Sequence, residues 1–368
     1  MIKLTQKLNS FTISKLDSSS DFDNQFLCSI QTSLRYLLIL LVWCFFTSHA
    51  SSNEGFKRTQ VIEIQKGWNA IFLEVDPIEF EPSELLSGTP IEIMATLHLR
   101  HNTSQYSTNP DANLLQKQGW TVWYENSRED SFLTNLSLIS GGKAYLVKSK
   151  ESFVWNIEGE VSIWSKFKWK TNAFNFVGFS VKKDQGPTFD QFFKPSAAHN
   201  DSDIYRLKDG KWILIEQKAV ETLKSGEAFW VFCKGKSNYS GPINVDVGSF
   251  SELIVGGNTG EIKIKNLSNF PIELTLKHFL ETGKPQPIDF GLRVLDEPDN
   301  PIQTLNLNLP DKNWTIGLPS LESGQGITVP LKSRSADMLQ DSYHSLLCVE
   351  SGIGTLNWIR LTNLKDNL

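Results

Sequence analysis

Cysteine is scarce in this chain, which has four in 368 residues. Cys28 and Cys44 lie within the first 50 residues, whereas Cys233 and Cys348 lie in different predicted domains of the remainder. Small secreted scaffolds held by disulfides need several paired cysteines, so the sequence excludes that class. We expect Cys233 and Cys348 to pack as small hydrophobic residues inside strands.

Motifs for nucleophilic, phosphate and metal chemistry are also missing. The sequence has no Gly-x-Ser-x-Gly elbow, and the glycine cluster at 256–260 lacks both the Gly-Lys-Ser/Thr ending and a following helix. His98 and His101 are three apart, so on a strand they face opposite sides and predict no zinc site. Acidic turns at 200–203 and 296–300 lack the spacing of a calcium loop and are interpreted as surface turns. The sequence therefore predicts no catalytic residue, no cofactor and no metal.

Positive charge is not in excess. The chain has 36 Lys and Arg against 41 Asp and Glu, which gives a formal net charge of −5. A mildly acidic chain without basic blocks is a poor partner for nucleic acid or for an anionic membrane surface. We therefore expect no nucleic-acid partner.

An apolar run near the N-terminus predicts export. Residues 36–46 (YLLILLVWCFF) follow Arg35 and precede small residues that end at Ala50, which fits a signal peptide cleaved after Ala50. The run is shorter than the ~20 residues of a membrane span, although an uncleaved N-terminal anchor is the alternative and the only membrane association we expect. Residues 1–34 are long for the region before such a run, so the true start of translation stays open, as does a truncated origin from a longer protein.

The remaining chain reads as β-strands. Short apolar runs rich in Val, Ile and aromatic residues are bounded by turn formers, and helical periodicity is nearly missing. The strands expected from these runs are 59–64, 70–75, 121–124, 144–148, 153–157, 174–181, 212–216 and 228–234. Short helices are predicted only at 82–86 and 188–193, each after the first long strand of its repeat.

One pattern occurs twice along the chain. The first copy reads GWNAIFL from 67, GWTVWY from 119 and SGGKAYLV from 140, and the second reads FNFVGF from 174, GKWIL from 210 and SGEAFWV from 225. The copies align with an offset of 106 at the front and 84 at the back, so the first holds about 22 extra residues, which we place in the polar segment 101–118. We predict repeat units at 59–161 and 162–247, each a small antiparallel sheet whose apolar face packs on the other.

The pattern changes after residue 247. Clean alternation of apolar and polar residues at 261–265 and 272–276 predicts strands with one buried and one wet face. Further strands are expected at 304–309, 326–331, 345–350 and 355–361. We predict a β-sandwich of about seven strands at 250–366, immunoglobulin-like in architecture but without the Cys…Trp…Cys spacing of antibody domains.

The repeat resembles one found in secreted and surface proteins of bacteria and archaea. That pattern runs Gly-Trp-Asn, a strand ending near Pro, Val-Trp-x-Tyr, and Gly-Lys-Gly-Tyr-Trp-Val. The chain matches it at 67–69, 76–77, 122–124, 142–147 and 226–231, with Ala144 and Ala228 where the family often has Gly and Phe174 in place of the first Trp. The resemblance covers about 59–247 and implies an all-β fold of tandem repeats, often followed by a β-sandwich module. It implies no catalytic residue.

Aromatic residues provide the remaining candidate site. Most tryptophans lie at repeat-matched strand positions, where core packing is the default. Trp164, Phe167 and Trp169 alternate with Ser and Lys between the two copies, so on a strand their rings share one face. One interpretation is a strand that packs this face between the copies. The other is an exposed platform that stacks on sugar rings.

These observations predict an exported, all-β protein of two tandem antiparallel β repeat units and an immunoglobulin-like β-sandwich. The function they favour is a non-enzymatic surface or extracellular structural or adhesion-type protein that binds a glycan or a cell-surface protein. The alternative is a secreted polysaccharide-active hydrolase, or its carbohydrate-binding accessory module. Its paired carboxylates meet only in space, so the sequence cannot mark them.

Overall fold

The computed structural model describes the part of the chain that follows the predicted leader, with gaps. The described residues are 56–98, 119–163, 167–248, 252–256, 260–280, 288–290, 293–294, 307–308 and 313–365. The predicted signal peptide with its cleavage site, the 101–118 segment and the acidic turn at 296–300 therefore lie outside them. In the described part, no helix is both long enough and apolar enough to cross a membrane.

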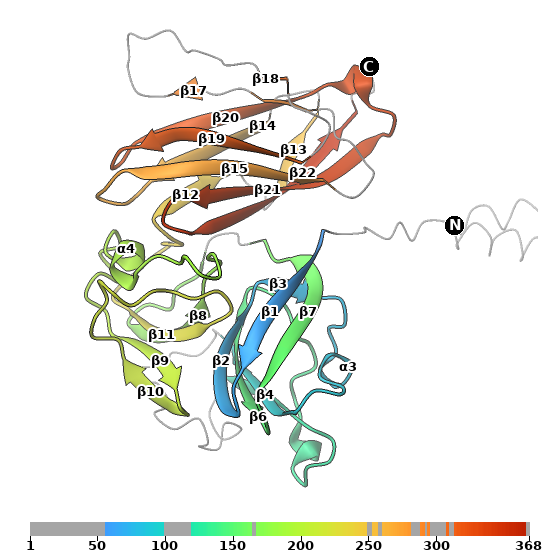
Figure 1. Cartoon of the computed structure of the whole chain (residues 1–368), viewed down its shortest axis with the longest axis vertical. Coiled ribbons are helices and arrows are strands. Elements are labelled where there is room, and N and C mark those ends of the chain that lie inside the picture. Colours follow the sequence, from blue (N-terminus) through green and yellow to red (C-terminus); the bar gives the residue numbers. More distant parts are fainter. Residues whose placement is uncertain are drawn as a thin grey trace, which may run out of the picture. The chain divides into compact units, whose positions relative to one another are not determined.

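The chain is all-β, and two of its sheets have four strands each (Figure 1). The sheet of the first copy, called copy 1, contains β2 (Gly67–Leu73), β4 (Ile91–Leu97), β5 (Trp120–Tyr124) and β6 (Lys143–Ser149). The sheet of copy 2 contains β8 (Ala173–Gly178), β9 (Ile204–Lys208), β10 (Lys211–Leu214) and β11 (Ala228–Cys233). The strand orders are β2-β6-β4-β5 and β8-β11-β9-β10, so both sheets run first, fourth, second, third. A duplicated unit would produce this shared order.

The pairing of the first and last strands is the same in both sheets. Asn69 on β2 lies opposite Val147 on β6, and Asn175 on β8 lies opposite Val231 on β11. These pairs differ by 106 on the first strand and by 84 on the last, which are the offsets of the sequence alignment. The aligned residues therefore occupy equivalent places in the two sheets.

The asparagine of the repeated pattern fixes the turn before the first strand. The Asn69 amide donates to the Gln65 carbonyl at 2.7 Å and accepts from the Gln65 N–H at 2.9 Å. Asn175 does the same with Lys170, at 3.2 and 2.8 Å. Asparagine offers both a donor and an acceptor on one short side chain, so this position serves folding rather than ligand binding.

The two sheets share one core, as expected from their apolar faces. From copy 1 it contains Trp68, Phe72, Trp120, Val122 and Leu146, among others, and from copy 2 it contains Phe174, Phe176, Trp212 and Trp230. Each sheet also buries its other face, so strands such as β8 are buried at every position. Burial on both faces explains why these strands read as continuous apolar runs instead of alternating ones.

The outer face of copy 1 is covered by a third sheet. It has the order β1-β7-β3 and consists of β1 (Lys57–Ile64), β7 (Phe153–Val161) and β3 (Val75–Pro77). Ile62 and Ile64 of β1 and Trp155 and Ile157 of β7 pack against the copy 1 sheet in one core. The helix α3 (Pro82–Leu85) follows β3, where a short helix was predicted.

The outer face of copy 2 is covered by the short helix α4 (Phe189–Phe193), which was also predicted. Thr188 accepts from the Gln191 N–H at 3.1 Å, and the Gln191 side chain accepts from the Thr188 N–H, so a capping box starts the helix. Phe189, Phe192 and Phe193 are buried in a core with the outer side of β8 and β11.

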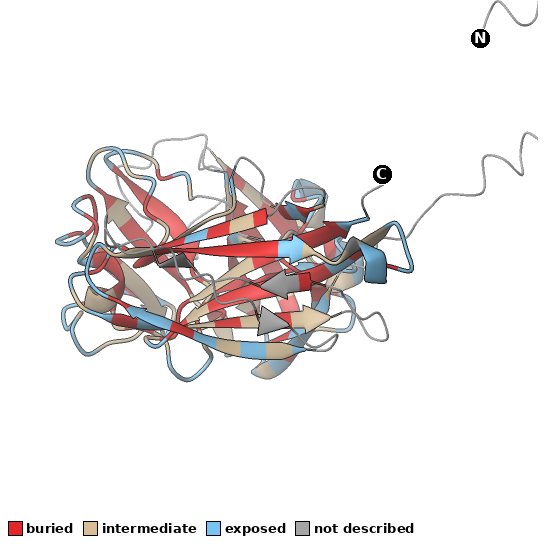
Figure 2. Ribbon diagram, turned by 90° about the horizontal axis from the view of Figure 1, so that it is seen from above, coloured by how far each residue is buried: buried red, intermediate tan, exposed pale blue. Residues whose placement is uncertain are grey.

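The remaining strands form an immunoglobulin-like sandwich of two sheets. One contains β12 (Ile243–Asp246), β14 (Gly260–Asn266), β16 (Ile288–Phe290), β17 (Arg293–Val294), β18 (Leu307–Asn308) and β20 (Gly326–Ser333). The other contains β13 (Glu252–Val255), β15 (Ile272–Leu280), β19 (Trp314–Leu321), β21 (Ser342–Ser351) and β22 (Leu356–Leu364). Their inner faces meet in one aliphatic core, and Figure 2 colours the strands by burial. Buried positions alternate with more exposed ones along β14 and β15, whereas the middle of β20 and of β21 is buried without a break.

The sandwich differs from the prediction in two respects. Among the residues that the structure describes, its sheets have six and five strands, more than the seven or so expected, because strands such as β19 contain Gly317 and Pro319 and do not show a strand pattern in the sequence. The strand β12 pairs with β14. It therefore belongs to the sandwich by hydrogen bonding, although the sequence places the end of the second unit at 247.

Candidate functional site

The predicted aromatic platform is in part a piece of the core. Trp164 lies outside the described residues. The rings of Phe167 and Trp169 lie 4.3 Å apart, and Trp169 is only 7% exposed in the core of copy 2. Its indole N–H donates to the Tyr239 carbonyl at 2.6 Å, and the His199 ring lies 4.0 Å away. Trp169 is therefore a packing residue, and the idea that it stacks on a sugar ring is corrected.

The other described tryptophans are also engaged in packing. Seven of the nine are buried, namely Trp68, Trp120, Trp123, Trp155, Trp169, Trp212 and Trp230. The half-buried Trp358 lies under the guanidinium of Arg58, 5.5 Å from its ring centre, and the half-buried Trp314 lies 4.9 Å from His278. Within the described part of the chain, the aromatic richness of the sequence is used mainly for cores.

A buried carboxylate joins the two copies. The Glu74 side chain, which follows β2, is inaccessible to solvent and accepts from the Ser225 hydroxyl at 2.5 Å. The Arg58 guanidinium lies 3.5 Å from its other oxygen. Next to it, the buried Gln60 amide donates to the Phe72 carbonyl and accepts from the Glu74 N–H. This polar cluster links β1, the end of β2 and the turn before β11.

Burial dominates the electrostatics of that cluster. Desolvation raises the pKa of Glu74, while the hydrogen bond from Ser225 and the charge of Arg58 oppose the rise. Glu227 lies two residues beyond Ser225, and burial likewise raises its pKa against the opposing charge of Arg206. Sequence reasoning had no means of finding Glu74, because its partner Ser225 is 151 residues away.

A serine–histidine pair lies behind α4. The Ser196 hydroxyl is 2.7 Å from Nδ1 of His199, and both residues are buried. Desolvation lowers the pKa of His199 to about 4, so the imidazole is neutral at ordinary pH. A Ser–His hydrogen bond is one element of nucleophilic catalysis, but here the Trp169 ring covers the imidazole and both groups are enclosed. The pair was not noticed in the sequence, where Ser196-x-x-His199 is an unspecific signal.

The acidic turn at 200–203 is held by ammonium groups. Lys218 Nζ donates to the Ser202 carbonyl at 2.5 Å, and Lys234 Nζ donates to the Asp201 carbonyl at 3.2 Å. Positive groups on these carbonyl oxygens oppose a calcium ion at the same place. Among the residues that the structure describes, no group of three or more His, Cys, Asp or Glu side chains is arranged to hold a metal.

Copy 1 carries a surface on which apolar and acidic side chains lie together. Ile78, Phe80 and Leu138 are 42%, 52% and 56% exposed, and the Ile139 N–H donates to the Phe80 carbonyl at 2.8 Å, which places Leu138 beside Phe80. Glu79 and Glu81 are exposed as well. We call Ile78, Phe80 and Leu138, with Glu79, Glu81 and Glu84, the acidic–apolar surface.

The carboxylates of this surface repel one another. A hydrogen bond with Glu79 and the charge of Glu81 raise the pKa of Glu84, which is fully exposed. Two hydrogen-bonded carboxyl groups formally meet the first requirement of a glycosidase. The acid of such a pair is normally sheltered from water, and these groups are not. The cluster is better suited to attracting a positive partner than to protonating a glycosidic oxygen.

Comparison with known proteins gives only distant likenesses. No family model and no curated protein matches the chain. Among solved structures, an Enterococcus faecalis MSCRAMM named ACE is 8% identical over 84% of this chain and 90% of its own, with a TM-score of 0.23. The CupB6 tip adhesin of Pseudomonas aeruginosa is 8% identical over 85% and 90%, with a TM-score of 0.20.

A Salmonella enterica SafA pilin in complex with the SafB chaperone is 13% identical, with a TM-score of 0.22. That match covers 34% of this chain and 55% of the other, so the chain spans about half the length of this structure. With TM-scores this low, none of these likenesses identifies a family.

Proposed function

We propose that the chain is an exported, non-enzymatic surface or extracellular protein of structural or adhesion type, which binds a protein or a glycan. Export is supported by the apolar run at 36–46 and the small residues up to Ala50. The binding role is supported by how the described residues are used.

The observation that carries the proposal is the contrast between the interior and the surface of copy 1. The buried ionisable groups inside the two copies, such as Glu74 in copy 1 and His199 in copy 2, are enclosed by packed side chains. They are therefore poorly placed to contact a substrate. The exposed apolar side chains of the acidic–apolar surface are not among the residues that form these cores. Exposed apolar groups next to unneutralised charge are typical of binding surfaces.

The hydrolase alternative has one feature in its favour, the hydrogen-bonded pair Glu79 and Glu84. A glycosidase would lose its activity when Glu84 is replaced by Gln, because the pair supplies the acid and the base or nucleophile. Release of reducing sugars from cell-wall polysaccharides, abolished in E84Q, would therefore favour the hydrolase and count against our proposal.

The binding role is tested with the fragment 51–368, which contains every described residue. The fragment is immobilised and offered purified cell-wall polysaccharides, a glycan array and extracellular-matrix proteins. We expect saturable capture of at least one of these classes. Complete absence of capture would remove the adhesion role. The export prediction has its own test, since N-terminal sequencing of secreted protein should begin at Ser51.

A further inference from the structure

The acidic–apolar surface combines two features that make docking favourable. The first is its apolar part, in which Phe80 and Leu138 lie next to each other across the hydrogen bond between the Ile139 N–H and the Phe80 carbonyl. Ile78 lies two residues before Phe80 in the chain, and its N–H donates to the Glu158 carbonyl at 3.0 Å. Each of these side chains is about half exposed, so a partner that covers them gains free energy by removing the remaining apolar surface from water.

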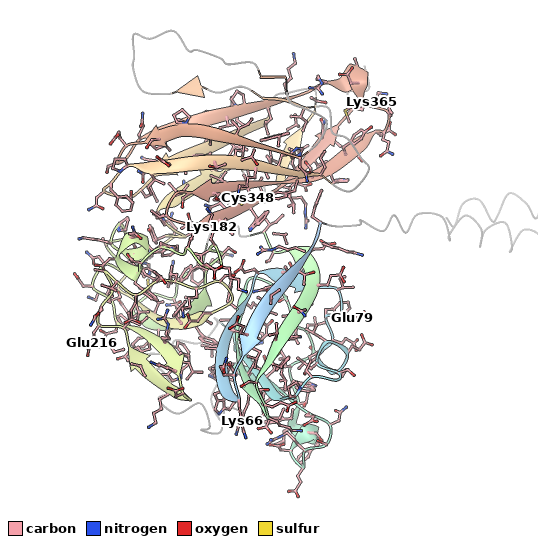
Figure 3. All side chains as sticks on the ribbon, viewed as in Figure 1. Lys66, Glu79, Lys182, Glu216, Cys348 and Lys365 are labelled. Carbon is pink, nitrogen blue, oxygen red and sulfur yellow. The ribbon has the colours of Figure 1, made fainter. Side chains whose placement is uncertain are left out.

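The second feature is uncompensated negative charge. Residues 76–91 contain four acidic residues and not one Lys or Arg, and within the described part of the chain none of these four carboxylates forms an ion pair, unlike Glu74, Glu92 and Asp130 on either side. The same segment carries Ile78 and Phe80 of the surface, and Figure 3 labels Glu79 near the turn that contains α3. The hydrogen bond with Glu79 and, after it, the charge of Glu81 raise the pKa of Glu84. A cation brought to the surface compensates this negative charge.

Stability of the fold does not explain this arrangement. Elsewhere in copy 1, acidic groups are paired, as in Glu92 with Arg128 and Lys148 or Glu125 with Lys150. Like charges crowded on an exposed turn cost stability instead of adding to it. The unpaired acids and the exposed apolar side chains therefore share one explanation if both contact a partner.

We propose that the acidic–apolar surface of copy 1 docks a protein segment that carries basic side chains around apolar ones, such as an amphipathic basic helix. The apolar side chains of the segment cover Phe80, Leu138 and Ile78, and its Lys or Arg groups lie over Glu79, Glu81 and Glu84. Charge complementarity selects this occupant over a neutral glycan, which would leave the acids crowded, and over an acidic partner, which it would repel. The inference rests on the proposed binding role and names its surface and partner chemistry.

The test uses fragment 51–368 and three synthetic 14-residue peptides. The probe is a fluorescein-labelled peptide of Leu and Lys with the leucines on one helical face. In the second peptide serine replaces leucine, and in the third glutamate replaces lysine. Fluorescence anisotropy should show binding of the first alone, weakened when salt rises from 50 to 300 mM, since exposed charge pairs are screened.

Variants locate the site. F80S with L138S should weaken the Leu–Lys peptide by about ten- to hundredfold, which is the loss of one to two covered side chains at ~1.4 kcal/mol per tenfold. Replacing Glu79, Glu81 and Glu84 by Gln should weaken it by about tenfold and remove most of the salt dependence. The matched control is L339S, which removes another leucine, 91% exposed but in the sandwich, and should leave binding unchanged. All altered side chains are exposed, so circular dichroism should stay constant and Tm should not fall in any variant.

Two results would overturn the proposal. One is equal affinity of the wild-type fragment for the Leu–Lys and the Ser–Lys peptide, which would reduce the surface to a weak ion attractor. The other is unchanged peptide binding in F80S/L138S. If peptide binding is unchanged in F80S/L138S and this variant also captures a glycan or matrix protein as the wild type does, the binding role stands and the docking surface is wrong. If the wild type captures neither peptide nor polymer, both proposals fail.

Discussion

Copy 1 and copy 2 have the same four-stranded sheet, yet the outer face of each sheet is covered differently. In copy 1 the cover is a second sheet, β1-β7-β3, with isoleucines and Trp155 at the contact. In copy 2 it is the five-residue helix α4 and two aromatic residues from loops, Trp169 and Tyr239. A sheet with both faces buried needs an apolar cover but sets no rule for its secondary structure. The repeated pattern therefore specifies the inner sheet, and the covers are free to differ.

The difference extends to polar groups. The cover of copy 1 brings Arg58 and Gln60 to the buried Glu74 and so ties copy 1 to copy 2. The cover of copy 2 encloses the neutral His199 and makes no comparable link. Acid should therefore act on the two copies with opposite sign, since protonation suits the buried Glu74 and does not suit the buried His199.

The largest effect should come from the core that the copies share. Trp230 is 1% exposed, and its ring lies 5.0 Å from Phe176 and 6.3 Å from Trp120. We expect W230A to lower the free energy of unfolding by about 3–5 kcal/mol in urea titration. F193A, in the cover of copy 2, is the comparison. Hydrogen exchange should speed up in both copies for W230A but only in copy 2 for F193A, and identical patterns would contradict separate covers.

A smaller but sharper effect is expected at the contact between β8 and β2. A Cβ added to Gly178 would lie 2.3 Å from Cβ and Cγ of the buried Phe72. G178A should therefore cost about 1–3 kcal/mol in the same titration, the usual cost of overpacking. Gly317 is the matched control, because a Cβ there meets nothing within 4 Å. If G178A left the free energy of unfolding unchanged, the two sheets would be able to move apart without cost.

The third prediction concerns pH and copy 2. The pKa of His199 is about 4 when folded, against 6.5 for the free side chain, so between these values the unfolded chain binds the extra proton. Stability is then unaffected by this group above pH 6.5 and falls as the pH falls towards 4, by about 2 kcal/mol from pH 7 to pH 5. H199N should remove this dependence from Tm measured over that range. A pH profile identical to that of the wild type would refute it.

The raised pKa values of Glu74 and Glu227 act in the other direction. Their folded forms hold protons more tightly than the unfolded chain, so they favour the folded state as pH falls and lose this contribution as pH rises through the folded pKa. The E74Q variant should be less sensitive to pH on the acid side than the wild type. Comparing E74Q with H199N therefore separates the pH effect of Glu74 from that of His199.

The last prediction tests the position that the copies share most closely, and its N69A arm has the smallest expected effect. Asn69 and Asn175 make the same turn contacts, but Asn175 is fully buried and Asn69 is half-buried. N175A should cost about 1–3 kcal/mol, because it leaves buried backbone groups unpaired, and N69A about 1 kcal/mol, because water can replace the amide. The reverse order in urea titration would show that the two turns are not equivalent.

The sequence predicted the fold better than it predicted the use of the residues. Long apolar runs predicted β2, β8 and β11 directly, because continuous burial leaves a continuous pattern, whereas β1 was predicted although its buried and exposed residues alternate. The strands β4 and β9 were not predicted, since Ile204–Lys208 mixes charged residues with apolar ones and Ile91–Leu97 carries no turn signal of the repeat.

Contacts across the chain were beyond any local pattern. Trp169 alternates with polar residues as an exposed aromatic strand would, but Tyr239, 70 residues later, takes its N–H into the core. The acidic–apolar surface arises in the same way, because Leu138 lies beside Phe80 only when the two segments fold together. A short stretch of sequence shows which residue types are present, whereas the site depends on contacts between residues that are far apart in the sequence.

The contact of Gly178 with Phe72 also fixes the order of the copies. These two residues are equivalent in the alignment, 106 positions apart, and they occupy one shared space. A chain with two versions of copy 1 would place two benzyl groups where only one fits, and a chain with two versions of copy 2 would leave a void there. The duplicated units are therefore not interchangeable modules. The contact between the two sheets needs one copy of each kind. Adding further identical units would therefore not reproduce this contact in a longer array.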